Sequence, residues 1–208
     1  DELRKEAPIE YKTYHPEDTN IEGLNKARSK AFIHLFLKGM YGIEGFEDRE
    51  HYITDDSYDG GIDAYYINKE SIVFVQSKFR TNEKNFENKE IDYDELLSMD
   101  VDRVIEGEEI DEDGNSYNSK ILKMQKEIQE VEDIGRYKYK VIILANLKEK
   151  RSKNIKRLTG GFSGDVFNFE RCYKELVFPV VSGCFFYAEE IRINLSLTNK
   201  EGNEGRIG

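Results

Sequence analysis

A continuous apolar run restricts the folds open to this chain more than any other feature. Residues 140–145 read Lys-Val-Ile-Ile-Leu-Ala, without alternation of polar and apolar side chains. Such a run is typical of a strand that is covered on both faces, as in the interior of an α/β sheet. The 208 residues are enough for one sizeable core but too few for two ordinary domains. We therefore expect a single domain built around this strand.

Segments with helical and strand patterns alternate along the rest of the chain. Apolar residues at helical spacing predict helices over 21–40, 93–105 and 119–134, a basic helical piece up to residue 159 and a short helix over 170–176. Strand patterns cover 62–67, 71–79, 166–169 and 177–197, and the first two flank Asn-Lys-Glu like a hairpin. Strands interleaved with helices predict a mixed α/β sheet with helices on its faces.

The predicted domain organisation has three parts. Residues 1–20, with two prolines and a histidine, are expected to form an N-terminal arm, and residues 21–195 the domain. Residues 196–208 are expected to be a tail or the start of a following region, because the apolar alternation over 191–197 has no partner after it. We expect a piece of a longer protein with further domains.

The net charge of −11 argues against indiscriminate binding to nucleic acid, which usually comes with a basic surface. Many of the acids lie in one run, 83–113, so local charge matters more than the sum. Cys172 and Cys184 do not form a C-x-x-C pair or suggest a disulfide framework. No apolar run reaches the roughly 18 residues that span a bilayer. These features predict a soluble, cytoplasmic protein without membrane association.

Three side chains of the predicted hairpin combine the chemistry of a metal site. Residues two apart in a strand point to the same face, so Gln76 and Lys78 project together. An even turn centred between residues 69 and 70 would place Asp63 opposite Gln76, with Cβ atoms about 4.5–5.5 Å apart. An odd loop would break this register. A carboxylate and an amide oxygen can bind Mg²⁺, and a bound cation with a lysine nearby suits phosphodiester hydrolysis.

The same residues resemble a known superfamily. Asp59-Gly60-Gly61-Ile62-Asp63-Ala64 and, after the turn, Val75-Gln76-Ser77-Lys78-Phe79 resemble the core of PD-(D/E)XK nucleases, in the variant whose last acid is Gln. The helix that starts Asn-Ile-Glu-Gly-Leu is similar to the first core helix of Mrr-like restriction enzymes. With the later Val-Ile-Ile-Leu-Ala-Asn, the chain is most similar to the N-terminal nuclease domain of abortive-infection phage-resistance (AIPR-type) proteins, over about 21–146.

The resemblance implies a restriction-endonuclease-like fold and a DNA endonuclease that acts in phage defence with Mg²⁺, for which Mn²⁺ can substitute. It implies Asp63, Gln76, Lys78 and Glu22 as catalytic residues, of which all but Lys78 would bind the metal. Gln76 departs from the pattern, because a neutral amide binds a cation less strongly than a carboxylate. Glu22 either compensates for this or closes a capping box with Thr19.

Several alternatives stay open. The chain could be a nuclease-fold module that binds nucleic acid or a partner protein without cleavage, although a lysine beside a carboxylate favours the enzyme. It could cleave RNA instead of DNA, and it could act as a homodimer. Asp55-Asp56-Ser57-Tyr58-Asp59-Gly60 is similar to the start of a calcium loop, but Tyr66 stands where the bidentate glutamate belongs. His34 is interpreted as a core histidine.

A basic segment at 148–157 offers a contact for the DNA backbone. If the segment is helical, its cations Lys153, Lys156 and Arg157 share one face, while Ile155 and Leu158 anchor it to the core. Such a face could neutralise a few phosphates. The alternative is a solvated face that pairs with the acidic run.

Overall fold

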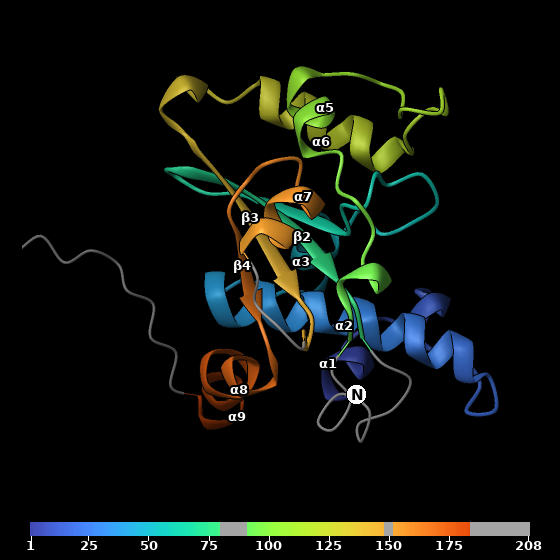
Figure 1. Ribbon diagram of the computed structural model, residues 1–208. Coiled ribbons are helices and arrows are strands. Elements are labelled where there is room, and N and C mark those ends of the chain that lie inside the picture. Colours follow the sequence, from blue (N-terminus) through green and yellow to red (C-terminus); the bar gives the residue numbers. More distant parts are fainter. Residues whose placement is uncertain (80–90, 148–151, 184–208) are drawn as a thin grey trace, which may run out of the picture.

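The computed structural model describes residues 1–79, 91–147 and 152–183. At its centre is a four-stranded sheet in the order β1-β2-β3-β4 (Figure 1). The strands are β1 (Ala64–Ile67), β2 (Ser71–Ser77), β3 (Lys138–Leu144) and β4 (Gly164–Phe167). The β1–β2 pair is antiparallel, and the other two pairs are parallel. The predicted mixed α/β sheet is therefore confirmed.

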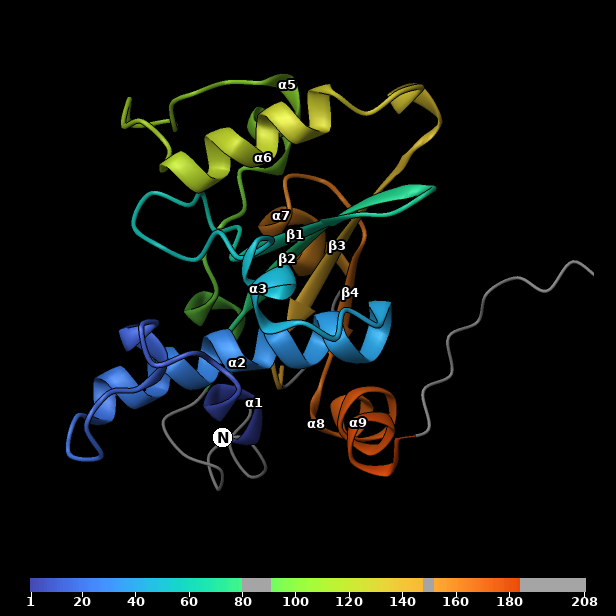
Figure 2. The same ribbon diagram turned by 180° about the vertical axis from the view of Figure 1, so that it is seen from behind.

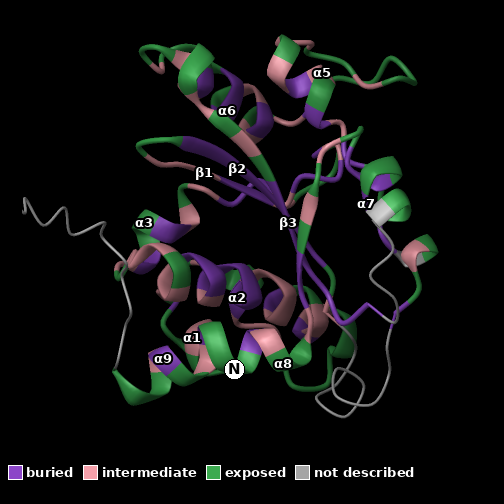
Figure 3. Ribbon diagram, turned by 60° about the vertical axis from the view of Figure 1, so that its left-hand side comes forward, coloured by how far each residue is buried: buried purple, intermediate pink, exposed green. Residues whose placement is uncertain are grey.

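Helices cover both faces of the sheet (Figures 1 and 2). α2 (Ile21–Tyr41) lies against the face that carries Val73 and Val75, while α5 (Val101–Glu106) and α6 (Ser119–Gln129) lie against the face that carries Phe74. The buried residues of β2 thus alternate between the two layers, as the pleat requires. β3 does the same over its second half, because Val141 joins one core and Leu144 the other. Figure 3 shows the buried residues concentrated between these layers.

The hairpin has the even register that the sequence predicts. Ala64 pairs with Val75 and Ile67 pairs with Ile72. The Asn68 side chain sets the turn, since its Oδ1 accepts hydrogen bonds from the Glu70 and Ser71 backbone N–H groups at 2.9 and 2.8 Å. Side chains that bond to the backbone two or three residues later are a common way to stabilise a tight turn.

α2 begins and ends at residues suited to those positions. The Asn20 side chain accepts a hydrogen bond from the Gly23 N–H at 2.9 Å, and Gly42 ends the helix with a φ of 67°. Near its end, a Cβ added at Gly39 would lie 3.3 Å from Leu176 Cα, so the glycine permits close packing of the C-terminal helical segment.

The helix predicted over 93–105 is wrong in its first half. The structure has a short 3₁₀ turn, η2 (Tyr93–Glu95), and then α5 from Val101. The backbone N–H of Met99 donates to Leu158 O at 2.8 Å, and that of Asp100 donates to Gly60 O at 2.9 Å. These tertiary hydrogen bonds take donors that a continuous helix would use within itself.

The C-terminal part also departs from the prediction. A helical series, α8 (Phe169–Cys172), the π turn η4 (Tyr173–Val177) and α9 (Phe178–Ser182), replaces the strand expected to begin at residue 177. Buried Leu176 packs in the same core as α2, which stabilises a helix despite the β-prone composition. The remainder of the expected strand, from residue 184, lies outside the described residues. The predicted 119–134 helix ends earlier, at Gln129, before a 3₁₀ turn, η3 (Ile134–Arg136).

Residues 1–20 pack against α2 through a buried polar network. They contain α1 (Glu2–Lys5) and the 3₁₀ turn η1 (Lys12–Tyr14). The Tyr14 hydroxyl lies 2.9 Å from His34 Nε2 and donates to Glu50, which ends α3 (Phe46–Glu50). Arg49 Nε donates to His34 Nδ1 at 3.1 Å, so Nε2 carries the proton of the neutral ring. The interpretation of His34 as a core histidine is confirmed, and burial lowers its pKa.

None of the helices in the described ranges is long and apolar enough to cross a bilayer.

Candidate metal centre

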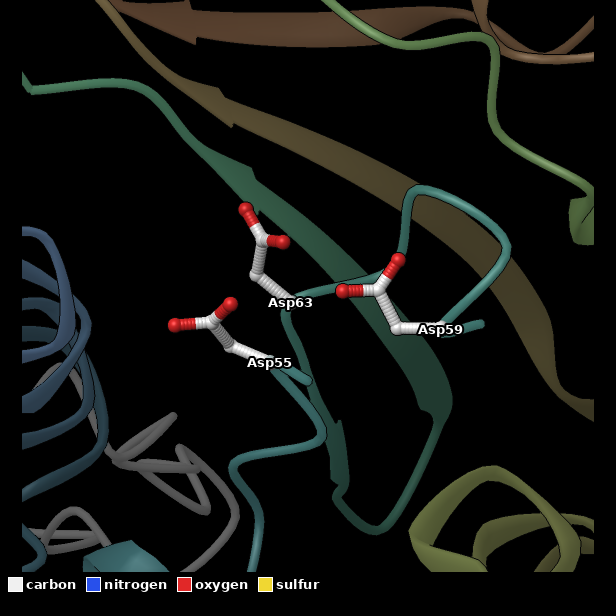
Figure 4. A group of neighbouring side chains, drawn as sticks. All are labelled: Asp55, Asp59 and Asp63. Atoms are coloured by element: carbon white, nitrogen blue, oxygen red, sulfur yellow. The ribbon is translucent and has the colours of Figure 1, made fainter. Parts of the chain in front are cut away.

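Three carboxylates meet where the loop after α3 enters β1. Asp55, Asp59 and Asp63 each offer an oxygen, and these oxygens lie within 4.8 Å of one another (Figure 4). The loop can fold this way because Gly60 and Gly61 have φ values of 62° and 70°. Positive φ is accessible to glycine at little cost. The glycine pair therefore turns the chain so that residues four apart present their side chains to one place.

Glycine is required at position 61 for a second reason, because the backbone of Ser98 lies close to it. A Cβ atom at this position would overlap with the backbone carbonyl oxygen of Ser98. The Gly61 N–H also donates to Asp59 Oδ1 at 2.9 Å, which orients that carboxylate. The sequence motif Asp-Gly-Gly thus has a local physical basis in this fold.

The three acids line a cavity of about 520 Å³ together with residues from β2 and α2. Gln76, Ser77 and Lys78 come from the end of β2 and the residue after it, and Asn25, Lys26 and Ser29 come from α2. The structure therefore brings Asp63, Gln76 and Lys78 to one cavity, as the sequence predicts. The volume is within the range of about 300–1,000 Å³ usual for ligand sites.

Asp63 reaches the cavity in a different way from the one expected. The regular pairing of β1 and β2 ends at Ala64 and Val75, so Asp63 and Gln76 are not a ladder pair. Instead the Asp63 N–H donates to Val75 O at 2.8 Å, and the carboxylate accepts a hydrogen bond from the Ser77 N–H at 2.6 Å. The carboxylate is thereby fixed over the end of β2.

Gln76 is the most informative residue of the site. It is 3% exposed, and its Nε2 donates to Gly61 O at 2.8 Å and to Leu97 O at 3.0 Å. These two carbonyls fix the orientation of the amide, because a flipped amide would set its oxygen against them. The remaining atom, Oε1, is buried and no group of the described residues bonds to it. A buried acceptor without a partner costs about 1–3 kcal/mol, which calls for a ligand.

The charges of the site favour a bound cation. Burial raises the pKa of Asp63 well above its usual value, and the neighbouring Asp55 and Asp59 raise it further, while the Ser77 N–H and Lys78 oppose the rise. Burial likewise raises the pKa of Asp59 to about 6. Carboxylates that repel one another in a partly dry site hold either protons or a cation.

Two lysines flank the acids. Lys30 Nζ donates to Asp55 O at 2.9 Å and lies 3.8 Å from Asp55 Oδ2, and its side chain is largely buried. The Lys78 side chain is exposed at the cavity, while its backbone N–H donates to Leu144 O at 3.0 Å. Lys30 therefore already contacts Asp55, whereas Lys78 adds an exposed cation to the lining of the cavity.

Glu22 does not line the cavity. Its carboxylate pairs with Lys26 at 3.3 Å, and 82% of its side chain is exposed. The N-cap of α2 is Asn20 rather than Thr19, so Glu22 stands one position too early in the helix for the predicted capping box. One turn later, Asn25 lines the cavity, and its Oδ1 is buried without a hydrogen-bond partner among the described residues.

The structure confirms the helix expected in the basic segment, as α7 (Ser152–Leu158). Ile155 and Leu158 are buried and anchor it, and its predicted contact residues are exposed, namely Lys153, Lys156 and Arg157. Leu158 O accepts the hydrogen bond from the Met99 N–H, and the segment before Met99 carries Leu97, which lines the cavity. One segment thus contacts α7 and also lines the cavity of the candidate metal centre. That the cations bind DNA stays a prediction.

Asp55, Asp59 and Asn25 were not predicted as site residues. The signal available was the spacing of four between the acids at 55, 59 and 63. In the sequence, both acids fall in the segment that is similar to the start of a calcium loop of the EF-hand kind, and Asp59 also begins the Asp-Gly-Gly motif. Tyr66, at the place of the bidentate glutamate, lies in β1 with its ring 4.3 Å from that of Tyr41, so that loop type still finds no support.

Comparisons of the chain with models of protein families, with characterised proteins and with solved structures found no match. A function for the chain is therefore inferred from the residues of the site and from the motif described above.

Proposed function

We propose that this chain is a metal-dependent phosphodiester hydrolase of the PD-(D/E)XK kind, with a restriction-endonuclease-like fold. The observation that carries the proposal is the buried Oε1 of Gln76, which has no hydrogen-bond partner among the described residues and belongs to the cavity that Asp63 and Lys78 also line. An oxygen without a donor beside several carboxylates suits a cation and not another acceptor. The exposed lysine beside it suits an anionic substrate.

The residues present fit a hard divalent cation such as Mg²⁺ or Mn²⁺. Asp63, Asp59 and Asp55 supply carboxylate oxygens, and Gln76 supplies a neutral amide oxygen. Such ions take oxygen ligands from a few side chains and keep several waters. When bound, the ion would lower the pKa of a coordinated water and stabilise negative charge on a phosphate. The clustered acids would also be relieved of their mutual repulsion.

The other residues of the site bind the substrate or orient the carboxylates. Lys78 is placed to bind a phosphate oxygen or the attacking water, and its ammonium neutralises the charge that develops during hydrolysis. Lys30 fixes Asp55 through the backbone and side-chain contacts described above. The N–H of Ser77 holds the Asp63 carboxylate in one orientation. The chain therefore arranges its ligands before substrate arrives.

The substrate we propose is nucleic acid, with DNA as the first candidate, and the role is defence against phage. Both follow from the resemblance of the Asp-Gly-Gly-Ile-Asp-Ala and Gln-Ser-Lys-Phe motifs to AIPR-type proteins. Exposed cations at Lys26, Lys78 and α7 offer local contacts for phosphates on a chain with a net charge of −11. RNA as the substrate, a homodimer and further domains belong to the same set of proposals.

A cleavage assay tests this function. The purified chain would be incubated with supercoiled DNA, linear DNA and RNA in Mg²⁺, Mn²⁺ or EDTA. We expect cleavage in either metal and none in EDTA, and we expect Asp63→Asn and Lys78→Ala to abolish it while the folded structure remains. Asp111→Asn is the matched control, because Asp111 is a partly exposed acid that does not line the cavity. Undiminished cleavage by both site variants would refute the assignment.

One observation favours a second candidate, a nuclease-fold module that binds without cleaving. The amide nitrogen of Gln76 joins Gly61 and Leu97 by two hydrogen bonds that a carboxylate could not donate. Gln at this position thus has a structural benefit apart from catalysis. In the assay above, this candidate predicts binding of nucleic acid without products in any metal.

A further inference from the structure

Tyr58, beside the metal centre, has an unusual backbone conformation. Its φ is 60°, and within the described ranges the only other non-glycine residue with positive φ is Asp133. The left-handed region brings the Cβ of an L-residue close to the backbone, so a bulky side chain there is strained. The ring does not regain this energy by burial, because Tyr58 is 59% exposed. The fold alone gives no reason for a tyrosine here.

The position of Tyr58 is fixed by α6. Asn118, the N-cap of this helix, donates its backbone N–H to Tyr58 O at 3.0 Å. Its side-chain Nδ2 lies 3.3 Å from Ser57 O and 3.2 Å from Thr54 O. The other end of the same amide caps α6 through Lys120 and Ile121. The loop that carries the tyrosine is thus attached to a helix packed on the sheet, which fixes the Tyr58 backbone in advance of any ligand.

Tyr58 borders the proposed phosphate site. Tyr58 lines the same cavity as Asp63 and Lys78, and it directly precedes Asp59. Leu97, 64% exposed, lines this cavity as well. An aromatic and an aliphatic side chain with solvent-exposed surface therefore lie next to the acids and the lysine. A ligand that combines a phosphate with a flat apolar ring would contact both kinds of surface.

We propose that Tyr58 is a stacking platform for an unpaired base, so that the site takes single-stranded or locally unpaired nucleic acid in preference to intact duplex. This inference rests on the proposed function, which places a phosphate at Lys78 and the metal. In a duplex the faces of the bases are covered by their neighbours, and extruding a base costs free energy. A single strand exposes those faces, and every base can stack on an aromatic ring.

Stacking also offers a way for a negatively charged chain to bind nucleic acid. With a net charge of −11, the protein gains little from long-range attraction of a polyanion. Contact between a base and a ring does not depend on neutralising phosphates, so it adds affinity without a basic surface. Tyr58 is therefore a specificity-determining residue for substrate strandedness.

Fluorescence anisotropy tests the inference. Labelled oligothymidylate, oligouridylate and a blunt-ended, fully paired DNA duplex would be titrated with Asp63→Asn protein, which keeps the Tyr58 loop and is expected not to cleave. Adding Tyr58→Ser should weaken binding of both single strands by about 5- to 150-fold and leave duplex binding unchanged. Tyr58→Phe should match the parent. Tyr173→Ser is the control, because Tyr173 is 55% exposed and does not line the cavity.

The Tyr58→Gly variant distinguishes a structural role of the tyrosine from a role in binding. Glycine adopts a positive φ without strain, so the melting temperature of the variant should equal or exceed that of the parent, while the affinity of the variant for single strands falls. Unchanged single-strand affinity in Tyr58→Ser, equal weakening for duplex, or no binding of single strands by the parent would each overturn the inference. Loss of affinity on Tyr58→Ser supports it even if the wild-type chain cleaves nothing in any metal, so the nuclease proposal can fail separately.

Discussion

Replacing Asp59 by Asn should stabilise the metal-free protein and weaken its response to Mg²⁺. Burial raises the pKa of Asp59 from 3.8 to about 6 in the folded state. Below pH 3.8 the carboxyl is protonated whether the chain is folded or not, so it imposes no penalty. The free-energy cost of burying the ionised carboxylate grows as the pH rises from 3.8 to about 6, and it is complete above about pH 6. A rise of this size corresponds to about 3 kcal/mol of folding free energy at neutral pH.

The stabilisation expected for Asp59→Asn is smaller than this cost of burying the charge. Asp59 Oδ1 accepts a hydrogen bond from the Gly61 N–H at 2.9 Å, and an amide oxygen can keep this bond. The second oxygen lies 3.4 Å from the Asp56 N–H, where an amide nitrogen would oppose another donor. Subtracting about 1 kcal/mol for that loss leaves a net stabilisation of about 2 kcal/mol in EDTA at neutral pH.

Urea denaturation with and without Mg²⁺ measures both effects. In EDTA the wild-type protein should lose stability as the pH rises from about 4 to 6, and Asp59→Asn should lose less. Mg²⁺ should stabilise the wild type more than the variant, because only the wild type has the full set of ligands. For Asp111→Asn we expect no gain, since hydrogen bonds from Asn115 lower the pKa of Asp111. A variant less stable than wild type in EDTA, with an equal response to Mg²⁺, would refute the reasoning.

Three further predictions concern neighbouring features. Gln76→Glu should bind Mg²⁺ more tightly by calorimetry yet lower stability in EDTA, because a carboxylate cannot donate to Gly61 O and Leu97 O; weaker binding would argue against Gln76 as a ligand. Gly61→Ala should cost at least about 1–3 kcal/mol in urea denaturation, because of its positive φ and the contact with Ser98; an unchanged midpoint would contradict this account. If α7 contacts duplex DNA, a triple serine variant should flatten the slope of log affinity against log salt by about two to three, and an unchanged slope would place the DNA elsewhere; the replaced residues are Lys153, Lys156 and Arg157.

The parts of the fold that follow local rules were predictable. The even hairpin turn at Asn68, the length of α2 between Asn20 and Gly42, and the burial of Ile155 and Leu158 in α7 all depend on residues close in sequence. The prediction failed where distant groups compete with local preference. Met99 and Asp100 donate to carbonyls outside a helix, and Leu176 packs against α2. No pattern in the nearby sequence predicts these contacts.

The candidate site also contains residues that local sequence predicts and residues that it does not. The even register of the hairpin brings Asp63, Gln76 and Lys78 to the same end of β2, where all three line one cavity. Asp63 itself lies beyond the last ladder pair, and the Ser77 N–H holds its carboxylate there, a contact that the sequence pattern does not predict. Asp55 and Asp59 join them only through the path of a loop with two glycines in positive φ, which composition alone cannot specify. Glu22 misses the cavity because α2 presents its next turn there.

Diffraction from a crystal grown with Mn²⁺ tests the central claim most directly, because anomalous scattering locates the ion without assumptions about activity. The account predicts one strong peak in the cavity, about 2 Å from a carboxylate oxygen of Asp63 and from Oε1 of Gln76. A map in which the cavity lacks a peak, with Gln76 Oε1 accepting a hydrogen bond from a protein group instead, would contradict it.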